Sequence, residues 1–398
     1  MNYDEIIDLD KEYVANTYKR FNIALKKGEG STLYDFNDKK YIDFGSGIAV
    51  NIFGANFKPW NEAIINQLTN IAHTSNLYYS APQVRLAKML CDKTGFKRVF
   101  FSNSGAEANE GAIKVARKYS MDKYGANRYE IITLVNSFHG RTMATLSATG
   151  QDHFHQYFNP FLEGFVHAIA NDINDLESKI NDKTCAIMLE TIQGEGGILC
   201  LDSTYVKKIY ELCQNKDILL IVDEVQTGNG RTGELYSYMY YDIKPDIITT
   251  AKGLGGGLPI GAIMLGDKVY ETLKYGDHGS TFGGNLISCS GAVAILENIT
   301  DEVLNDVKRK SKIIFDYLEN IKGVRSVSGR GLMIGIETEK NASDIANKCI
   351  EKGLIVLTAK TKVRLLPALN ITDKELLDGL KILKEVIEEW SIYWNYLI

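Results

Sequence analysis

Short apolar runs alternate with longer segments of helical pattern between residues 98 and 266. Strands separated by helices are typical of a parallel sheet, because each parallel connection has to cross over the sheet. The pattern therefore predicts an α/β fold with helices covering the sheet. The predicted strands are Val99–Ser102, Ile131–Val135, Ala186–Glu190, Ile218–Asp223, Ile247–Thr250 and Ala262–Leu265.

After about Asp301 the pattern changes to helix, strand, helix, strand and helix, which indicates a smaller α+β domain. We expect residues 41–300 to form a large domain with a mostly parallel sheet, and residues 1–40 to pack with residues 301–398 as a small domain. Thr372 and Glu375 form a capping box at the start of the last helix. The predicted elements of the small domain are Val303–Ile321, Gly331–Glu337, Asp344–Lys352, Lys362–Leu366 and Lys374–Trp390.

Composition narrows the class of protein. The 398 residues are 45% apolar and 24% charged, which is ordinary for a globular enzyme. The formal net charge is -5 and no basic run is interleaved with aromatics, so we expect no binding to nucleic acid or to anionic membranes. A signal pattern and a long apolar stretch are both absent, which favours a cytoplasmic protein. The six cysteines lack the spacing of zinc or disulfide motifs, so no metal is expected.

Polar residues gather where the predicted strands end, and ligands of open parallel sheets bind beyond the carboxyl ends of the strands. After the first strand, Ser104 and Glu107 form a capping box. Gly105 exposes backbone amides at the positive end of this helix, which is a place for an anion or a phosphate. By itself, the pattern is more typical of a plain helix start.

Two further loops carry candidate groups. Phe138 and Arg141, after the second strand, could stack on a planar ligand and bind a carboxylate. They could equally be a core phenylalanine and a surface arginine. Glu190 and Glu195 follow the third strand in a glycine-rich loop, where acids are usually solvated.

The next two strands lead to a carboxylate and an amine. Asp223 closes an almost entirely apolar strand and needs a partner there, because an unpaired buried charge is strongly unfavourable. Lys252 follows the apolar run that ends at Thr250 and precedes a glycine stretch. Most loop lysines are solvated, but an amine near buried chemistry can form a Schiff base.

The loop Gly228–Gly233 has the glycine spacing of a dinucleotide-binding motif. Four residues separate it from the strand that ends at Asp223, and the residues from Glu234 to Tyr240 are mostly bulky. That motif requires small residues after its glycines, because its helix packs closely on the strand. We therefore reject a nicotinamide-dependent oxidoreductase.

Taken together, these groups match the needs of one cofactor. A phosphate site, a stacking aromatic, a strand-end aspartate and a lysine that can form an imine fit pyridoxal phosphate. Asp223 would keep the ring nitrogen protonated, so that the ring draws electrons from the substrate, and Lys252 would hold the aldehyde. Each group alone is a weak signal, whereas the set is specific.

At these residues the chain resembles the class III aminotransferases, of pyridoxal phosphate fold type I, and most closely the acetylornithine aminotransferase group. The resemblance runs from about Tyr18 to Glu389 and implies a role for each cofactor-binding residue. These are Lys252 as the Schiff-base lysine, Asp223 at the pyridine nitrogen, Phe138 and Val225 on the two ring faces, Gly105 and Ala106 at the phosphate, Gln226 near the ring hydroxyl, Glu190 orienting that network, and Thr281 as a phosphate ligand from the partner subunit of a homodimer.

The resemblance also implies the substrates. Arg141 looks like the anchor for a distal carboxylate, and Arg364 like a second carboxylate site that Glu195 opens and closes. Tyr18 and Ser280 lie in segments similar to the family's substrate-binding parts. Two arginines suit a dicarboxylate, since a guanidinium binds a carboxylate through paired hydrogen bonds. The implied reaction, a step of arginine biosynthesis, moves the terminal amino group of N-acetylornithine to 2-oxoglutarate, giving N-acetylglutamate 5-semialdehyde and glutamate.

Several related activities share the cofactor. Gly47 stands where ornithine aminotransferases carry a tyrosine, which leaves room for an acylated substrate. Gly54–Pro59 departs from the family's pattern, because it lacks the histidines that many relatives place before this proline. Succinylornithine, ornithine and 4-aminobutyrate aminotransferases are the alternatives. A non-catalytic protein on the same scaffold would not need to retain Lys252 and Asp223.

Overall fold

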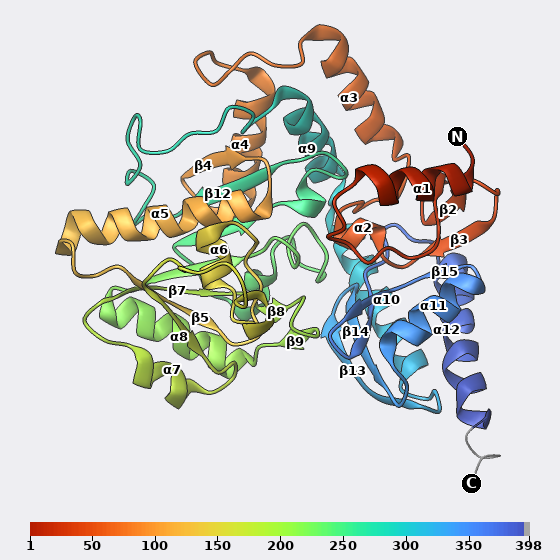
Figure 1. The fold of residues 1–398 in the computed structure, drawn as a ribbon. Helices are drawn as coiled ribbons and strands as arrows, with labels where there is room; N and C mark the ends of the chain where they lie inside the picture. The colour runs from red at the N-terminus through yellow and green to blue at the C-terminus, as the bar shows by residue number, and fades with distance from the viewer. Residues whose placement is uncertain (394–398) are drawn as a thin grey trace.

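In the computed structural model, which describes residues 1–393, the chain forms two lobes (Figure 1). The larger lobe, at the left of Figure 1, contains a seven-stranded sheet, and the first and the last described helices lie on the smaller lobe. The last five residues of the predicted small domain lie outside the described residues.

The seven-stranded sheet has the strand order β4-β12-β11-β10-β7-β5-β6. Neighbours from β11 to β6 are parallel, whereas β12 runs antiparallel to both β11 and β4. The carboxyl ends of all strands except β12 therefore lie at one edge. The strands are β4 (Arg98–Ser102), β5 (Glu130–Leu134), β6 (Phe165–Ala168), β7 (Thr184–Leu189), β10 (Leu219–Asp223), β11 (Ile247–Thr250) and β12 (Gly261–Leu265).

Both faces of this sheet are buried, as the unbroken apolar runs require. In β10, Leu219 and Ile221 belong to the cluster on the α5 side, whereas Leu220 and Val222 pack into the larger core on the opposite face. That core includes side chains of α4, α7 and α8. The remaining elements of this lobe are α3 (Lys58–Asn70), α4 (Ala81–Thr94), α5 (Gly105–Tyr124), α6 (Met143–Ala148), α7 (Ile173–Lys179), α8 (Ser203–Lys216), α9 (Leu286–Asn298), the short strands β8 (Ile192–Gln193) and β9 (Leu199–Cys200), and 3-10 turns at Asp152–Phe154, Ser237–Tyr241 and Lys252–Leu254.

The smaller lobe contains an antiparallel sheet of order β13-β14-β17-β16, next to which lie the helices α10, α11 and α12. A second sheet, β1-β2-β3-β15, joins the two ends of the chain, because β3 pairs with β15 in parallel through Ile42 and Leu354. The elements are α1 (Tyr3–Tyr13), β1 (Leu25–Glu29), β2 (Thr32–Asp35), β3 (Lys40–Asp43), α2 (Ser46–Ala49), α10 (Asp301–Leu318), β13 (Val324–Arg330), β14 (Met333–Thr338), α11 (Ala342–Glu351), β15 (Leu354–Ile355), β16 (Leu357–Ala359), β17 (Lys362–Leu365) and α12 (Asp373–Tyr393).

Most predicted elements are present. The structure adds strands that were not predicted, among them β6 and β13. The predicted strand β12 runs antiparallel to its neighbours in the large sheet. The sequence of β13, VRSVSGR, has no apolar run, because only part of this edge strand is covered. The capping box at Thr372 and Glu375 is confirmed, with each side chain accepting a hydrogen bond from the other residue's backbone at 3.2 and 3.1 Å.

Some features are absent from the described part of the chain. Among residues 1–393 no helix combines the length and the apolar character that crossing a membrane requires. The same residues hold no group of three or more histidine, cysteine or acidic side chains that could bind a metal ion. All six cysteines are free thiols.

Candidate functional site

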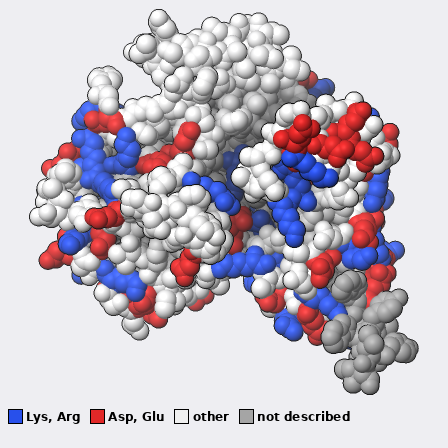
Figure 2. All heavy atoms as spheres, viewed as in Figure 1, with Lys and Arg blue, Asp and Glu red and all other residues white. Residues whose placement is uncertain are grey.

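A cavity of about 470 Å³ opens at the carboxyl edge of the large sheet. Its wall comes from the loops that follow β4, β5, β7, β10 and β11, together with short segments at 50 and 257–260. Figure 2 shows this face of the molecule hollowed between the two lobes, with Lys and Arg side chains along the hollow. The predicted site residues in the wall are Gly105, Ala106, Phe138, Arg141, Glu190, Asp223, Val225, Gln226 and Lys252.

Lys252 lies in this wall directly after β11. Its backbone has a φ of 46°, in the left-handed region that non-glycine residues rarely adopt, and such strain is common at functional sites. Asn229 steadies the preceding residues, because its side-chain amide donates to Thr250 Oγ1 at 3.0 Å and to the Ala251 carbonyl at 3.3 Å. Burial lowers the pKa of the Lys252 amine. This shift is toward the neutral amine, which can act as a nucleophile or base.

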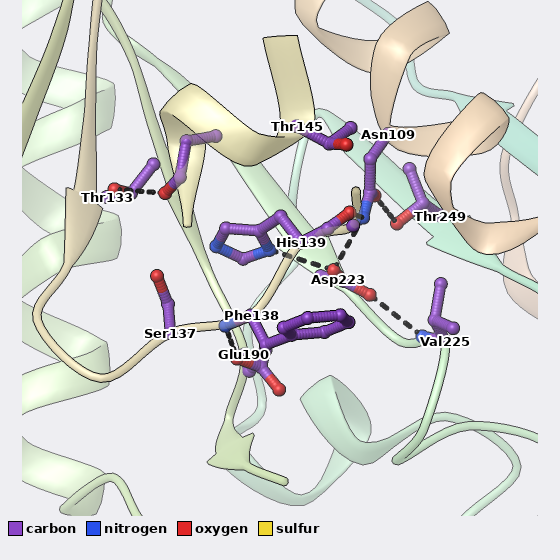
Figure 3. Close-up of polar contacts among 12 residues, drawn as sticks. Asn109, Thr133, Ser137, Phe138, His139, Thr145, Glu190, Asp223, Val225 and Thr249 are labelled. Carbon is purple, nitrogen blue, oxygen red and sulfur yellow. Dashed lines mark hydrogen bonds and ion pairs between the residues drawn. The ribbon is translucent and has the colours of Figure 1, made fainter. Parts of the chain in front are cut away.

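Asp223 ends β10 with a side chain that is almost fully buried and is fixed by three hydrogen bonds (Figure 3). Oδ2 accepts from Asn109 Nδ2 at 2.7 Å and lies 2.8 Å from His139 Nδ1. Oδ1 accepts from the Val225 backbone amide at 3.0 Å. The carboxylate lines the cavity and can accept a further hydrogen bond there. It is suited to bind an N–H group of a flat ring.

Asn109 and His139 are functional residues that the sequence analysis missed. Asn109 lies on α5, and its orientation is set by Thr249 Oγ1, which donates to Asn109 Oδ1 at 2.6 Å. His139 follows Phe138, and its Nδ1 must donate because the carboxylate only accepts. The requirement for a partner at a buried aspartate was a signal that such groups exist, but it did not identify them.

The start of α5 provides free backbone amides. Ser104 Oγ accepts from the Glu107 amide at 3.2 Å, as the capping box predicts, whereas the Glu107 carboxylate accepts from the Asn103 amide at 2.7 Å. The amides of Gly105 and Ala106, at the cavity wall, have no hydrogen-bond partner among residues 1–393. A Cβ atom at Gly105 would lie 2.7 Å from Val225 Cγ1, so glycine is required here. Free amides at a helix start suit a phosphate.

Glu190 holds the loop that carries Phe138. Its carboxyl oxygens accept from the Phe138 amide at 2.8 Å and from the Gly194 amide at 3.1 Å. Burial raises the pKa of Glu190 to about 7. The Phe138 ring and the Val225 side chain both line the cavity, and the space they border can take a planar ring.

Arg364, the predicted second carboxylate site, contacts Glu195, the residue predicted to open and close that site (together called the gate below). Arg364, on β17, is almost completely buried, and its Nη1 lies 2.5 Å from Glu195 Oε1. Gln226 connects this pair to the cavity wall, because it accepts from Arg364 Nη1 at 3.2 Å and donates to Glu195 at 3.3 Å. Burial opposes the charge on Glu195, but the guanidinium prevails and lowers the pKa of this carboxyl. Arg364 Nε is buried and has no hydrogen-bond partner within the described residues.

Five predicted site residues lie outside the cavity wall: Glu195 and Arg364, which reach it through Gln226, and Tyr18, Ser280 and Thr281. Tyr18 is 72% exposed, with the Arg20 guanidinium 5.6 Å from its ring centre. Thr281 is exposed on the segment before α9. Its neighbour Ser280 accepts from Asn103 Nδ2 at 3.1 Å, and Asn103 does line the cavity.

The loop Gly228–Gly233 does not open a dinucleotide-binding helix. It is followed by a single 3-10 turn at Ser237–Tyr241, in agreement with the rejection of that motif. Instead, the fully buried Arg231 donates to the carbonyls of Leu332 and Pro367 in the smaller lobe. The loop therefore links the two lobes beside the strand that precedes Lys252.

Comparison with known proteins places these residues in a family. The family model for class III aminotransferases matches residues 13–387. The acetylornithine aminotransferase of Haemophilus ducreyi is 54% identical over 98% of this chain and 100% of its own length. The ornithine aminotransferase of Toxoplasma gondii superposes with a TM-score of 0.94 at 30% identity, over 99% of this chain and 96% of that one. The N-acetylornithine aminotransferase of Stenotrophomonas maltophilia superposes with a TM-score of 0.84 at 36% identity, over 97% and 100%.

Proposed function

The chain belongs to the class III aminotransferases, and from this premise we propose that it moves the terminal amino group of N-acetylornithine to 2-oxoglutarate. The products are N-acetylglutamate 5-semialdehyde and glutamate, so the reaction is a step of arginine biosynthesis. The relative from Haemophilus ducreyi, matched over its whole length, supports this substrate. The alternative amino donors are succinylornithine, ornithine and 4-aminobutyrate, the substrates of the related activities.

Pyridoxal phosphate fits the cavity. The free amides of Gly105 and Ala106 suit its phosphate, and Asp223 suits its ring nitrogen. Phe138 and Val225 would border the two ring faces, Gln226 would approach the ring hydroxyl, and Glu190 orients the Phe138 loop. When bound, this cofactor supplies an aldehyde that takes up the amino group and a protonated ring that draws electrons away from the reacting carbon.

Lys252 would carry the proton transfer. Burial lowers the pKa of its amine, which shifts the amine toward the basic form that removes a proton from the reacting carbon. Asp223 would keep the ring nitrogen protonated. Hydrogen bonds from Asn109 and His139 hold its carboxylate in place at the cavity wall. These roles use only groups that border one space.

The proposed choice of substrates rests on the ion pair between Arg364 and Glu195. The reacting carbon of N-acetylornithine bears no carboxylate, whereas that of glutamate does. With Arg364 neutralised by Glu195, the site suits the first substrate, and once Glu195 withdraws it suits the second. Arg141, in the cavity wall, would bind the far carboxylate of both substrates. By resemblance to the family, Tyr18 and Ser280 would contribute to substrate binding at the entrance.

We further propose a homodimer, in which Thr281 of the partner subunit completes the phosphate site. Thr281 is exposed and outside the cavity wall of its own chain. Large apolar side chains are exposed close to it along the chain, among them Phe282 at 60% and Tyr275 at 110%. The upper part of Figure 2 likewise shows few charged side chains. The six free thiols suit the cytoplasm as the place of the reaction.

The test is turnover by the purified protein supplied with pyridoxal phosphate. Glutamate formation from 2-oxoglutarate is measured with N-acetylornithine, N-succinylornithine, ornithine and 4-aminobutyrate as amino donors. N-acetylornithine should give the highest kcat/KM. A higher value for another donor would replace the proposed substrate, and no glutamate with any donor would overturn the proposal.

A further inference from the structure

Phe154 contacts two groups that the proposed function uses. Its ring centre lies 4.7 Å from Arg141 Cζ and 5.6 Å from the centre of the Phe138 ring. Arg141 Cζ also lies 6.0 Å from the Phe138 ring centre. Phe154 is not part of the cavity wall. It packs behind both residues and connects the ring that borders the cofactor space to the guanidinium at the cavity mouth.

Arg141 has few other contacts that could fix it. The residue is exposed, and within residues 1–393 its guanidinium makes no ion pair and no hydrogen bond. A free arginine side chain samples many rotamers, and binding a carboxylate in one of them costs entropy. The faces of Phe154 and Phe138 are thus the contacts that can restrict it, through attraction between a cation and aromatic rings.

The position of Phe154 is itself well fixed. It ends the 3-10 turn Asp152–Phe154, and its amide donates to the Gln151 carbonyl at 3.0 Å. The Gln151 side chain donates to the carbonyl of Ser137 at 3.1 Å, directly before Phe138. On the other side, His155 Nε2 lies 2.9 Å from the Leu146 carbonyl in α6, the helix that begins just after Arg141. The turn is therefore tied to both segments that Phe154 connects.

We propose that Phe154 is a positioning residue that holds the Arg141 guanidinium at a set distance from the Phe138 ring. This distance determines which length of carbon chain fits between the reacting carbon and the far carboxylate. The inference rests on the proposed function, in which Arg141 binds that carboxylate. It adds a residue that touches neither substrate nor cofactor.

The test compares Phe154→Ala, Phe154→Tyr and the control Phe158→Ala in the enzyme loaded with pyridoxal phosphate. Phe158 is an exposed aromatic of the same loop, and its ring contacts the ring of Tyr157. Two quantities are measured: the Kd of glutarate by calorimetry, and, in the enzyme loaded instead with pyridoxamine phosphate, the single-turnover kcat/KM ratio of 2-oxoglutarate to 2-oxobutyrate, which lacks the far carboxylate. Phe154→Ala should weaken glutarate binding and lower this ratio, each by about 10-fold. Phe154→Tyr and Phe158→Ala should stay near the wild type.

A double-mutant comparison isolates the coupling to Arg141. In an Arg141→Ala background, Phe154→Ala should cause no further loss of glutarate affinity, because the group it positions is gone. Additive losses would overturn the proposal, as would an unchanged Kd in Phe154→Ala. Equal losses for both oxo acids, with a changed visible absorbance of the cofactor, would mean that Phe154 acts through Phe138 and would also overturn it. Failure of the proposed function is distinguishable, since the wild type itself would then not use 2-oxoglutarate.

Discussion

Arg364 Nη1 lies 2.5 Å from Glu195 Oε1, which joins a strand of the smaller lobe to a loop of the larger one. Arg364 is almost completely buried, so its charge needs this partner when no substrate carboxylate is present. Gln226 contacts both members of the pair and also lines the cavity. A change in the contact between Arg364 and Glu195 can therefore affect the cavity through Gln226.

Arg364→Ala should separate the two half-reactions. We expect the half-reaction with glutamate and 2-oxoglutarate to weaken by about 10- to 100-fold, the effect of losing roughly 1.5 to 3 kcal/mol of charge-assisted hydrogen bonding. The half-reaction with N-acetylornithine should be largely spared, because its reacting carbon bears no carboxylate. Stopped-flow measurement of each half decides this. Equal losses in both halves would contradict the division of roles, and Arg141→Ala is the control that should affect both.

Glu195→Ala should do the opposite. Without its carboxylate the Arg364 guanidinium stays free, so the site should favour α-amino acids over terminal amines. The kcat/KM ratio of glutamate to N-acetylornithine should rise in this variant. Glu195→Gln is the matched control for size, and a ratio that stays at the wild-type value in both variants would rule out the gate.

Lys252 should be the residue that binds the cofactor covalently. Reduction of the loaded protein with borohydride, followed by peptide mass mapping, should place the pyridoxyl group on Lys252. Its amine borders the cavity, and burial lowers its pKa. Lys252→Ala should give no adduct under the same conditions. A pyridoxyl group on a different lysine of the wild type would sink the assignment.

Asp223→Asn should still bind the cofactor yet lose most turnover. The amide keeps the shape of the side chain, but a neutral group cannot hold the ring nitrogen protonated. Single-turnover rates and the visible absorbance of the bound cofactor are the measurements. Glu224→Gln is the control, because Glu224 is buried next to Asp223 but outside the cavity wall. Near-normal single-turnover rates in Asp223→Asn would refute the role.

Glu224 should also give a pH-dependent contribution to stability. Burial raises its pKa to about 7, above the ordinary value of 4.5, so folding favours the neutral form. The contribution is complete below pH 4.5 and is lost as the pH rises through 7. The unfolding free energy of the wild type minus that of Glu224→Gln should therefore fall by up to about 3 kcal/mol between pH 4.5 and pH 8. Urea unfolding at one protein concentration measures it, and a pH-independent difference would contradict the pKa shift.

The sequence by itself determined the strands of the large sheet and the residues that follow them. A strand buried on both faces must be apolar throughout, so β10 is visible as an apolar run and Asp223 stands out at its end. The carboxyl ends of parallel strands share one edge, so the sequence predicts that Lys252, Asp223 and Gly105 lie at one site, and they line one cavity. This set of residues by itself indicates pyridoxal phosphate, and resemblance to the family then implies the substrates.

Only the tertiary structure decided which side chains contact each other. Asn109 and His139 reach Asp223 from α5 and from the loop after β5, and no spacing along the chain encodes these contacts. The antiparallel direction of β12 follows from its pairing with β4, which its apolar sequence does not reveal. The edge strand β13 is identified only by its pairing with β14, because its sequence is largely polar. The packing of Phe154 on Arg141 likewise depends on where a short turn lies against α6. Apolar patterns report burial, whereas contacts between distant residues are fixed when the elements pack together.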